Sequence, residues 1–233
     1  MFQQRFSFLA LLFVLLFSRP IPVNAEIQNL PFRRISPSGG FTLSPVIEIS
    51  EDKQGFIWFM TREKLYHYNS QDFISFEPKY QAGVPHTNNY VTSMLIDRSN
   101  TIWVGTNTGA CIFNKHKWQM DAVRIIDREL PQRIIFPTNI KQNERGEIWM
   151  IESNNLALLD SASRELKFVR TNYGRLTVNA FCFDLSDNIF AANNLGDLYY
   201  IDSKTLKATR INVNLAPIKL FGIYLINNIC WSV

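Results

Sequence analysis

Three histidines, His67, His86 and His116, and two adjacent acids, Glu51 and Asp52, are the side chains best suited to metal or acid–base chemistry. The histidines share no spacing that would bring two of them to one metal ion. The segments "DKQGF" and "DRSNT" lack the alternating acids of a calcium-binding loop. We therefore predict no metal site, and we expect the histidines to face solvent and the two acids to be solvated in a turn.

Nucleophilic and phosphate-binding signatures are missing from the sequence. There is no Gly-x-Ser-x-Gly segment, and no cysteine is placed near a histidine in a way that indicates catalysis. The segment "GTNTG", residues 105–109, has the composition of a hairpin turn rather than of a phosphate cradle. The sequence thus predicts no catalytic residue, no cofactor site and no enzymatic activity within this chain.

The three cysteines, Cys111, Cys182 and Cys230, are widely spaced and odd in number. A chain with a large apolar inventory does not need disulfides to fold. We expect the cysteines to be buried as small hydrophobic residues, and the sequence leaves open whether any two of them pair.

A longer polar stretch, "PKYQAGVPHTNN" at residues 78–89, contains Tyr80, His86, Asn88 and Asn89. Such side chains stack on sugars and form hydrogen bonds with them. The same composition is typical of an ordinary connector between two elements, so the ligand-binding residues remain unassigned.

The first 25 residues have the features of a secretory signal peptide. Arg5 precedes the apolar run "FSFLALLFVLLF" at residues 6–17, and "VNA" at residues 23–25 supplies small residues for cleavage after Ala25. Twelve apolar residues are too few to span a bilayer, so we predict an exported mature chain, residues 26–233, without a membrane span. That mature chain carries 22 basic and 20 acidic residues, a balance too even to favour nucleic acid as a partner.

A degenerate repeat organises the mature chain. Its units align on the aromatic residues Trp58, Trp103, Trp149, Phe190 and Trp231, at spacings of 45, 46, 41 and 41 residues. The first four aromatics each follow an Asp or Asn by six residues: Asp52, Asp97, Asn143 and Asp184. A period of forty-odd residues is that of a propeller blade with four short strands.

Each unit can be divided into four expected strands joined by turns. An apolar strand such as "VTSMLI" precedes the Asp or Asn, whose side chain can accept backbone N–H groups in a tight turn. The Ile-Trp strand follows, then a third strand such as "ACIFN", and a more polar fourth strand such as "AVRII" at residues 122–126. We predict an all-β propeller of four-stranded antiparallel blades, with four to five blades in an incomplete ring. In this fold the tryptophans pack between adjacent blades with their rings face to face.

The segments "VIEISEDKQGFIWFMTREKLYHYN" (46–69) and "VTSMLIDRSNTIWVGTNTGACIFN" (91–114) resemble the two-component-regulator propeller repeat. "GVPHTNNYVTSML" resembles the linker before such repeats, and "FRRISPSGGFTLSPVIEIS" the start of a first blade. The later units keep less of the pattern, since only Gly105-Thr106 preserves its Gly-Thr step. Taken together, the mature chain is similar to the periplasmic N-terminal sensor region of hybrid two-component histidine kinases.

The resemblance implies a ligand-sensing propeller, with an oligosaccharide as ligand or a second protomer as partner, in the periplasm. The kinase activity of such receptors would lie outside this chain, which is expected to be a truncated or partial receptor. An open ring would expose a blade face and a strand edge, so we expect residues 26–233 alone to be poorly soluble or oligomeric. Two alternatives remain: an exported propeller enzyme acting on polysaccharide, and a non-signalling adhesive or interaction propeller.

Overall fold

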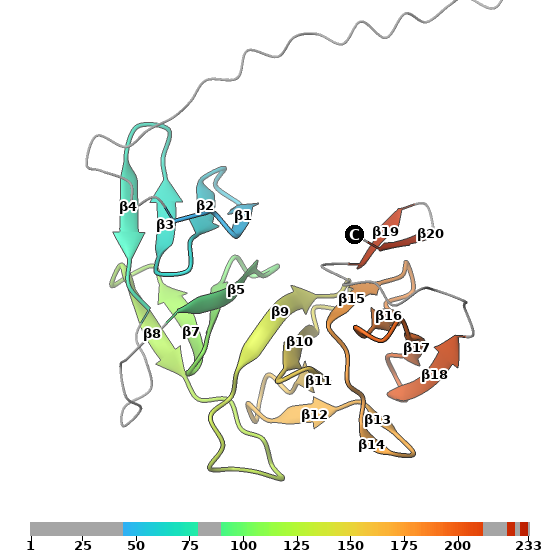
Figure 1. Cartoon of the computed structure of the whole chain (residues 1–233). Helices are drawn as coiled ribbons and strands as arrows, with labels where there is room; N and C mark the ends of the chain where they lie inside the picture. The colour runs from blue at the N-terminus through green and yellow to red at the C-terminus, as the bar shows by residue number, and fades with distance from the viewer. Residues whose placement is uncertain (1–43, 79–89, 212–222, 227–228, 233) are drawn as a thin grey trace, which may run out of the picture. The chain divides into compact units, whose positions relative to one another are not determined.

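A computed structural model describes residues 44–78, 90–211, 223–226 and 229–232 (Figure 1). Contacts divide the chain into two units, Met1–Ser36 and Pro37–Val233, and all of the described residues belong to the second. The predicted signal peptide lies outside the described residues, as do Tyr80, His86, Asn88 and Asn89. Within the described part of the chain, no helix is long and apolar enough to cross a membrane.

The first two units fold as predicted into four-stranded antiparallel sheets with the strands in chain order. Blade 1 contains β1 (Glu48–Glu51), β2 (Ile57–Met60), β3 (Leu65–Tyr68) and β4 (Phe73–Phe76). Blade 2 contains β5 (Val91–Ile96), β6 (Ile102–Thr106), β7 (Gly109–Asn114) and β8 (Gln119–Val123). Each aromatic of the repeat lies on the second strand of its blade, where β2 carries Trp58 and β6 carries Trp103.

The third and fourth units repeat the arrangement. Blade 3 contains β9 (Pro137–Gln142), β10 (Ile148–Glu152), β11 (Asn155–Leu159) and β12 (Leu166–Phe168). Blade 4 contains β15 (Ala180–Phe183), β16 (Ile189–Ala192), β17 (Leu198–Asp202) and β18 (Lys207–Ile211). A fifth unit is present as an antiparallel hairpin of β19 (Ile223–Ile226) and β20 (Ile229–Ser232), in which Tyr224 is paired with Trp231. The prediction of an all-β propeller with four to five blades is confirmed.

Two details of the predicted strands are wrong. The fourth strand of blade 2 runs from Gln119 to Val123 rather than over 122–126. Asn114 accepts the backbone N–H groups of His116 and Lys117, and this tight turn lets β8 begin directly opposite the end of β7.

The second difference is a hairpin that the repeat does not predict. The connection from blade 3 to blade 4 forms β13 (Arg170–Thr171) and β14 (Gly174–Arg175). Gly174 adopts a φ of 124°, which a side chain would strain. β13 then pairs in parallel with β18, and it extends the outer edge of blade 4.

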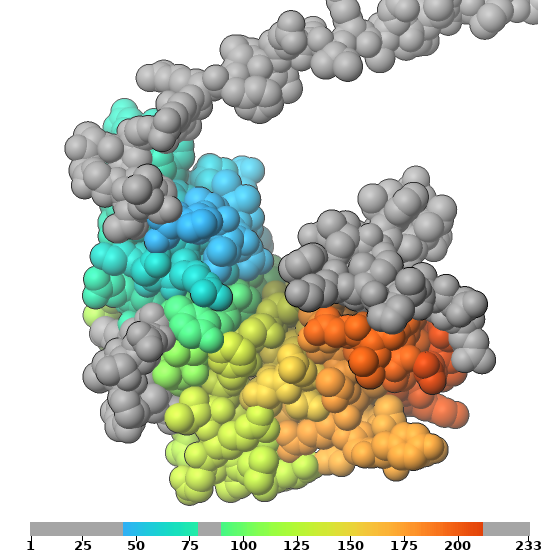
Figure 2. Space-filling model, viewed as in Figure 1, coloured from blue at the N-terminus to red at the C-terminus, as the bar shows by residue number. Residues whose placement is uncertain are grey.

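The apolar core lies between consecutive blades rather than inside one sheet. One cluster joins Trp58, Met60 and Leu65 of blade 1 to Ile102 and Phe113 of blade 2. Trp103 lies in the next cluster, between blades 2 and 3, and Trp149 in the third, between blades 3 and 4. In Figure 2 the coloured segments of successive blades accordingly lie directly against one another. Packing against the following blade is therefore confirmed for Trp58, Trp103 and Trp149, and the side chain of Trp231 lies outside the described residues.

The face-to-face arrangement of the indoles is wrong. The three tryptophans belong to three separate clusters, one for each interface. Trp58 instead meets the ring of Phe113 across the first interface at 4.9 Å between centroids, with the planes 60° apart. A tilted contact of this kind is favoured by the charge distribution of aromatic rings over a parallel sandwich.

The first strands of the blades lie next to one another: β1 contacts β5, β5 contacts β9, and β15 contacts β19. The close approach at β5 and β9 explains the Gly-Thr step of unit two. A Cβ on Gly105 would come within 2.6 Å of the Pro137 carbonyl oxygen and 2.7 Å of the hydroxyls of Ser93 and Thr92. Only glycine fits at position 105. The other units carry larger residues at the equivalent position.

Candidate functional site

The Asp or Asn that precedes each of the first four aromatics builds the turn between the first and second strands. In blade 1, Asp52 Oδ1 accepts the N–H groups of Gln54 and Phe56 at 2.9 and 3.1 Å. Its other oxygen, Oδ2, accepts the indole N–H of Trp58 at 2.9 Å, although the two residues are six apart. Asp97 repeats this geometry with Trp103, again at 2.9 Å. The two carboxylates therefore join a turn to the core side chain of the same blade.

The third unit breaks this pattern. Asn143 Oδ1 accepts the N–H of Glu147, but its amide nitrogen is a donor and binds the Glu147 carboxylate at 2.6 Å. The indole N–H of Trp149 is fully buried and has no hydrogen-bond partner among the described residues. The substitution of Asn for Asp at position 143 accounts for this orphaned donor.

A strip of polar residues on the first strands is the candidate functional site. We define the inner-strand strip as Glu48, Thr92 and Lys141, from β1, β5 and β9. Glu48 Oε2 accepts the N–H of Met94 at 2.7 Å, and Lys141 donates to the Phe181 carbonyl at 2.8 Å. Thr92 donates to the Pro137 carbonyl at 2.5 Å. Each of the three side chains thus reaches from its own blade to the next.

Burial shifts the two charged groups of the strip toward their neutral forms. It raises the pKa of Glu48, against the opposing effects of the Met94 N–H and of Lys141. It lowers the pKa of Lys141, against the charges of Cys182 and Glu48. A carboxyl and an amine with opposed shifts beside the axis of a propeller can hydrogen-bond the hydroxyls of a polar ligand, and shifted groups of this kind cluster at functional sites.

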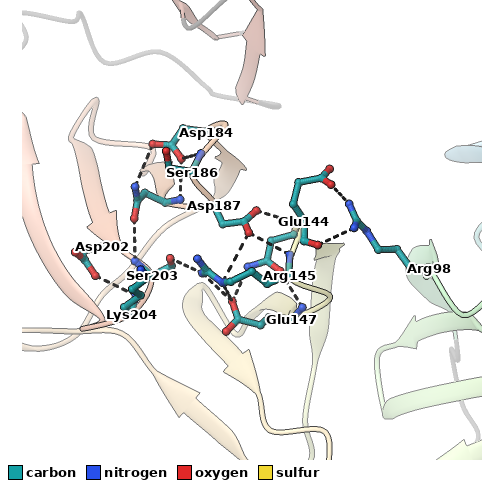
Figure 3. A network of polar contacts seen from close by, with 12 residues as sticks. Arg98, Glu144, Arg145, Glu147, Asp184, Ser186, Asp187, Asp202, Ser203 and Lys204 are labelled. Carbon is teal, nitrogen blue, oxygen red and sulfur yellow. Dashed lines mark hydrogen bonds and ion pairs between the residues drawn. The ribbon is translucent and has the colours of Figure 1, made fainter.

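A second polar cluster joins the turns that precede the second strands (Figure 3). Asp187 is buried and accepts the N–H groups of Glu144 and Arg145 at 2.7 and 3.1 Å, while Arg145 donates to Ser203 at 2.6 Å. Asn100 plays the same part between blades 1 and 2, where it accepts the Lys53 N–H. These contacts hold neighbouring blades in register, so we assign the cluster to structure.

Between blades 2 and 3 the equivalent position is Gly146, which has no side chain to accept a hydrogen bond. Gln142 takes over this role: its Oε1 accepts the Arg98 N–H at 2.7 Å, and its nitrogen donates to the Gly146 carbonyl at 2.9 Å. Arg98 also forms an ion pair with Glu144 across this interface.

A third cluster lies in the connections between blades. The buried carboxylate of Asp127 receives two hydrogen bonds from Arg175, both at 2.8 Å, and lies 3.9 Å from Arg133. Burial opposes its ionisation, but the bonds from Arg175 and the N–H groups of Glu129 and Leu130 outweigh it and lower the pKa of Asp127.

The same cluster extends to Glu152, which is fully buried. Its Oε1 lies 3.3 Å from Arg133 and accepts the Ser153 hydroxyl at 2.7 Å. Its Oε2 has no hydrogen-bond partner among the described residues.

Several expectations for single residues need correction. His67 is 3% exposed, not solvent-facing, because Phe56, Trp58 and Trp118 surround its ring. Burial, opposed by Asp52, lowers its pKa. Asp52 is 6% exposed and not solvated. His116 is exposed in a turn, as expected.

The remaining sequence candidates fall into two groups. Cys111 and Cys182 are buried as predicted, and the Cys230 side chain lies outside the described residues. No three side chains of His, Cys, Asp or Glu come together as a metal site in the described part of the chain. The sequence missed Glu48, Lys141 and the Asp127–Arg175 pair, since none of them recurs at a fixed offset in the repeat.

Comparison with known families places a two-component regulator propeller repeat at residues 85–108, across the start of blade 2. No curated protein matches the sequence. The match covers one repeat of the chain, and the four-stranded blades of the described residues agree with it.

Solved structures share the fold at low sequence identity. The extracellular domain described for the hybrid two-component system BT4673 of B. thetaiotaomicron matches with a TM-score of 0.65 and 18% identity, over 85% of this chain and 27% of that one. An inactive H270A virginiamycin B lyase of Staphylococcus aureus matches with a TM-score of 0.63 and 14% identity, over 82% of this chain and 63% of that one. This chain therefore spans about a quarter of that extracellular domain and under two thirds of the lyase.

Proposed function

We propose that the chain is the exported, ligand-sensing β-propeller portion of a two-component regulatory receptor, with an oligosaccharide as its ligand. The observation that carries the proposal is the regulator propeller repeat at residues 85–108, set in a fold shared with the BT4673 extracellular domain. The expected leader at residues 1–25 supports export, so the domain would meet its ligand in the periplasm.

The inner-strand strip is the surface through which we propose that the ligand acts. Glu48 and Lys141 each bridge two blades, so a ligand that competes for their hydrogen bonds changes the contacts between blades. A ligand can shift a conformational equilibrium only by binding its two states with different affinity. We also propose that two protomers pair, and that ligand binding controls a kinase outside this chain.

An exported propeller enzyme is the second candidate, and the likeness to virginiamycin B lyase is a likeness of fold alone. A non-signalling adhesive propeller is the third. The fold accommodates each of these functions, so the site must decide between them.

A binding and turnover assay on the full chain separates the three. The chain is produced with its own residues 1–25, and mass spectrometry of the exported product locates the cleavage site. The product is then screened against a panel of oligosaccharides by calorimetry and by chromatography of the saccharides. Saturable binding without new products supports the sensor, release of products identifies an enzyme, and no selective binding overturns the sensing role.

A further inference from the structure

A cavity of about 550 Å³ lies at the outer edge of blade 4. Its walls are the β13–β14 hairpin on one side and the strands β17 and β18 on the other. Three cationic side chains, Arg170, Lys207 and Arg210, line it together with hydroxyl and amide groups, and its lining includes no carboxylate. This cavity is separate from the inner-strand strip, since none of its lining residues lies on a first strand.

The pairing of the strands places two of the cations side by side and the third beside a tyrosine. Arg170 of β13 is the parallel partner of Lys207 of β18, and Arg210 lies directly opposite Tyr199 of β17. Directly paired residues share one face of a sheet, and so do residues two apart in a strand. Arg210, Tyr199 and Ala208 therefore lie on one face, where the side chain of Ala208 is small, and Lys207 and Arg170 lie on the other. Residues of both faces line the cavity.

The cations keep donors available for a ligand. Arg170 forms an ion pair with Glu129, and Arg210 with Asp197, but both arginine side chains are more than half exposed. Exposed pairs of this kind contribute little, and a guanidinium has five N–H donors, of which one carboxylate uses at most two. Lys207 forms no ion pair with any residue in the described ranges.

A neighbouring cavity provides a contrast. It has a volume of about 200 Å³ and is lined by Asp127, Glu129 and Glu165 as well as by Arg128 and Lys167. The negative charges of its acids offset the positive charges of its bases, so this cavity has no net electrostatic attraction for an anion. The larger cavity carries three positive charges in its lining and is big enough for a monosaccharide-sized group.

We propose that this larger cavity binds the carboxylate or sulfate group of an anionic saccharide, such as a uronate or a sulfated sugar. The proposal rests on the proposed function, and it names the class of ligand and a second place where the ligand is held. Lys207 and the two arginines bind the anionic group through charge-assisted hydrogen bonds. The fully exposed Tyr173 offers a ring to the sugar face.

Calorimetric titration of the full chain tests this assignment. The probes are tri-galacturonate, a sulfated disaccharide, neutral maltotriose and sodium sulfate. Lys207→Ala and Arg210→Gln should each weaken the binding of an anionic saccharide by about tenfold or more, because each removes a charge-assisted bond. Ala208→Leu should abolish binding by filling the hollow while every charge is kept.

Two matched controls separate charge from location. Lys204→Ala removes an exposed cation that does not line the cavity, and Thr209→Leu enlarges an exposed side chain of β18 that does not line it either. Both should bind the anionic probe like the unchanged chain. Near-normal circular dichroism of each variant shows that the fold is retained.

Each remaining outcome is decisive. Binding of maltotriose that the cavity variants leave unchanged would overturn this inference and leave the proposed function standing. Binding of sulfate as tight as that of the saccharides would overturn the saccharide assignment. The absence of binding to all probes would contradict the inference, whereas the wider panel of neutral saccharides still tests the proposed function.

Discussion

The indole N–H of Trp58 donates to the Asp52 carboxylate over 2.9 Å, and the same bond joins Trp103 to Asp97. The bond explains why an acid and a tryptophan recur six residues apart. One carboxylate oxygen closes the turn, and the other fixes the ring that packs against the next blade. Each unit thereby links its local turn to its packing between blades.

Replacing Trp58 by Phe should destabilise the chain more than replacing Trp149 by Phe. Both changes shrink a buried ring, but only the first leaves a carboxylate oxygen of buried Asp52 without its donor. We expect the free energy of unfolding to differ by about 1–3 kcal/mol between the two variants, measured by urea denaturation. Equal losses would show that the indole–carboxylate bond contributes nothing.

Asp187→Gly isolates the bonds between the turns of blades 3 and 4. Asp187 has a φ of 65°, which glycine adopts easily, so the change removes the carboxylate without adding backbone strain. Loss of the two bonds to Glu144 and Arg145 should lower the free energy of unfolding by about 1–3 kcal/mol.

Arg98→Ala is the matched control for this interface change. It removes exposed bonds from Arg98 to the carboxylate and the backbone carbonyl of Glu144, across the interface of blades 2 and 3, so it should cost under about 1 kcal/mol. A larger loss in Arg98→Ala than in Asp187→Gly would reverse our ranking of these contacts.

Asp127→Asn should lower stability at neutral pH by about 3 kcal/mol, because it leaves Arg175 largely buried without its main partner. The folded pKa of Asp127 is below its unfolded value near 4. Its contribution is therefore complete above about pH 4 and is lost as the pH falls through the lower folded pKa. Urea denaturation from pH 7 to pH 2.5 should show the two stability curves converging in acid, and parallel curves would refute the linkage.

Gly105→Ala should destabilise the chain by about 1–3 kcal/mol through overpacking. The added methyl group would meet the Pro137 carbonyl, which is backbone and cannot rotate away. Thr92→Ala, which removes a hydroxyl and a methyl group at the same place, serves as the control. Thermal denaturation of both variants measures the difference, and a Gly105→Ala variant of unchanged stability would show that β5 and β9 can separate at no cost.

The repeat could be predicted from the sequence because its physics is local. An Asp six residues before a Trp, with a residue of positive φ between them, determines a turn and a buried ring within one blade. Even the fifth unit, where Cys230 precedes Trp231, forms its hairpin at the predicted place.

The polar sites could not be predicted in this way, because their partners are some forty residues apart. Glu48 meets Met94, Asp127 meets Arg175, and Arg170 pairs with Lys207 only after the blades have packed. The hairpin in the connection to blade 4 has no counterpart in the repeat, so periodicity gives no signal for it. The sequence could not predict that His67 is buried, because the rings that cover it come partly from the next blade, through Trp118.

Calorimetric titration of the full exported chain with a panel of neutral and anionic oligosaccharides, followed by analysis of the saccharides for products, tests ligand sensing most directly. We predict saturable binding of one saccharide class, at one ligand per chain, and recovery of the saccharide intact. Binding of no saccharide, or conversion of the bound saccharide into products, would contradict it.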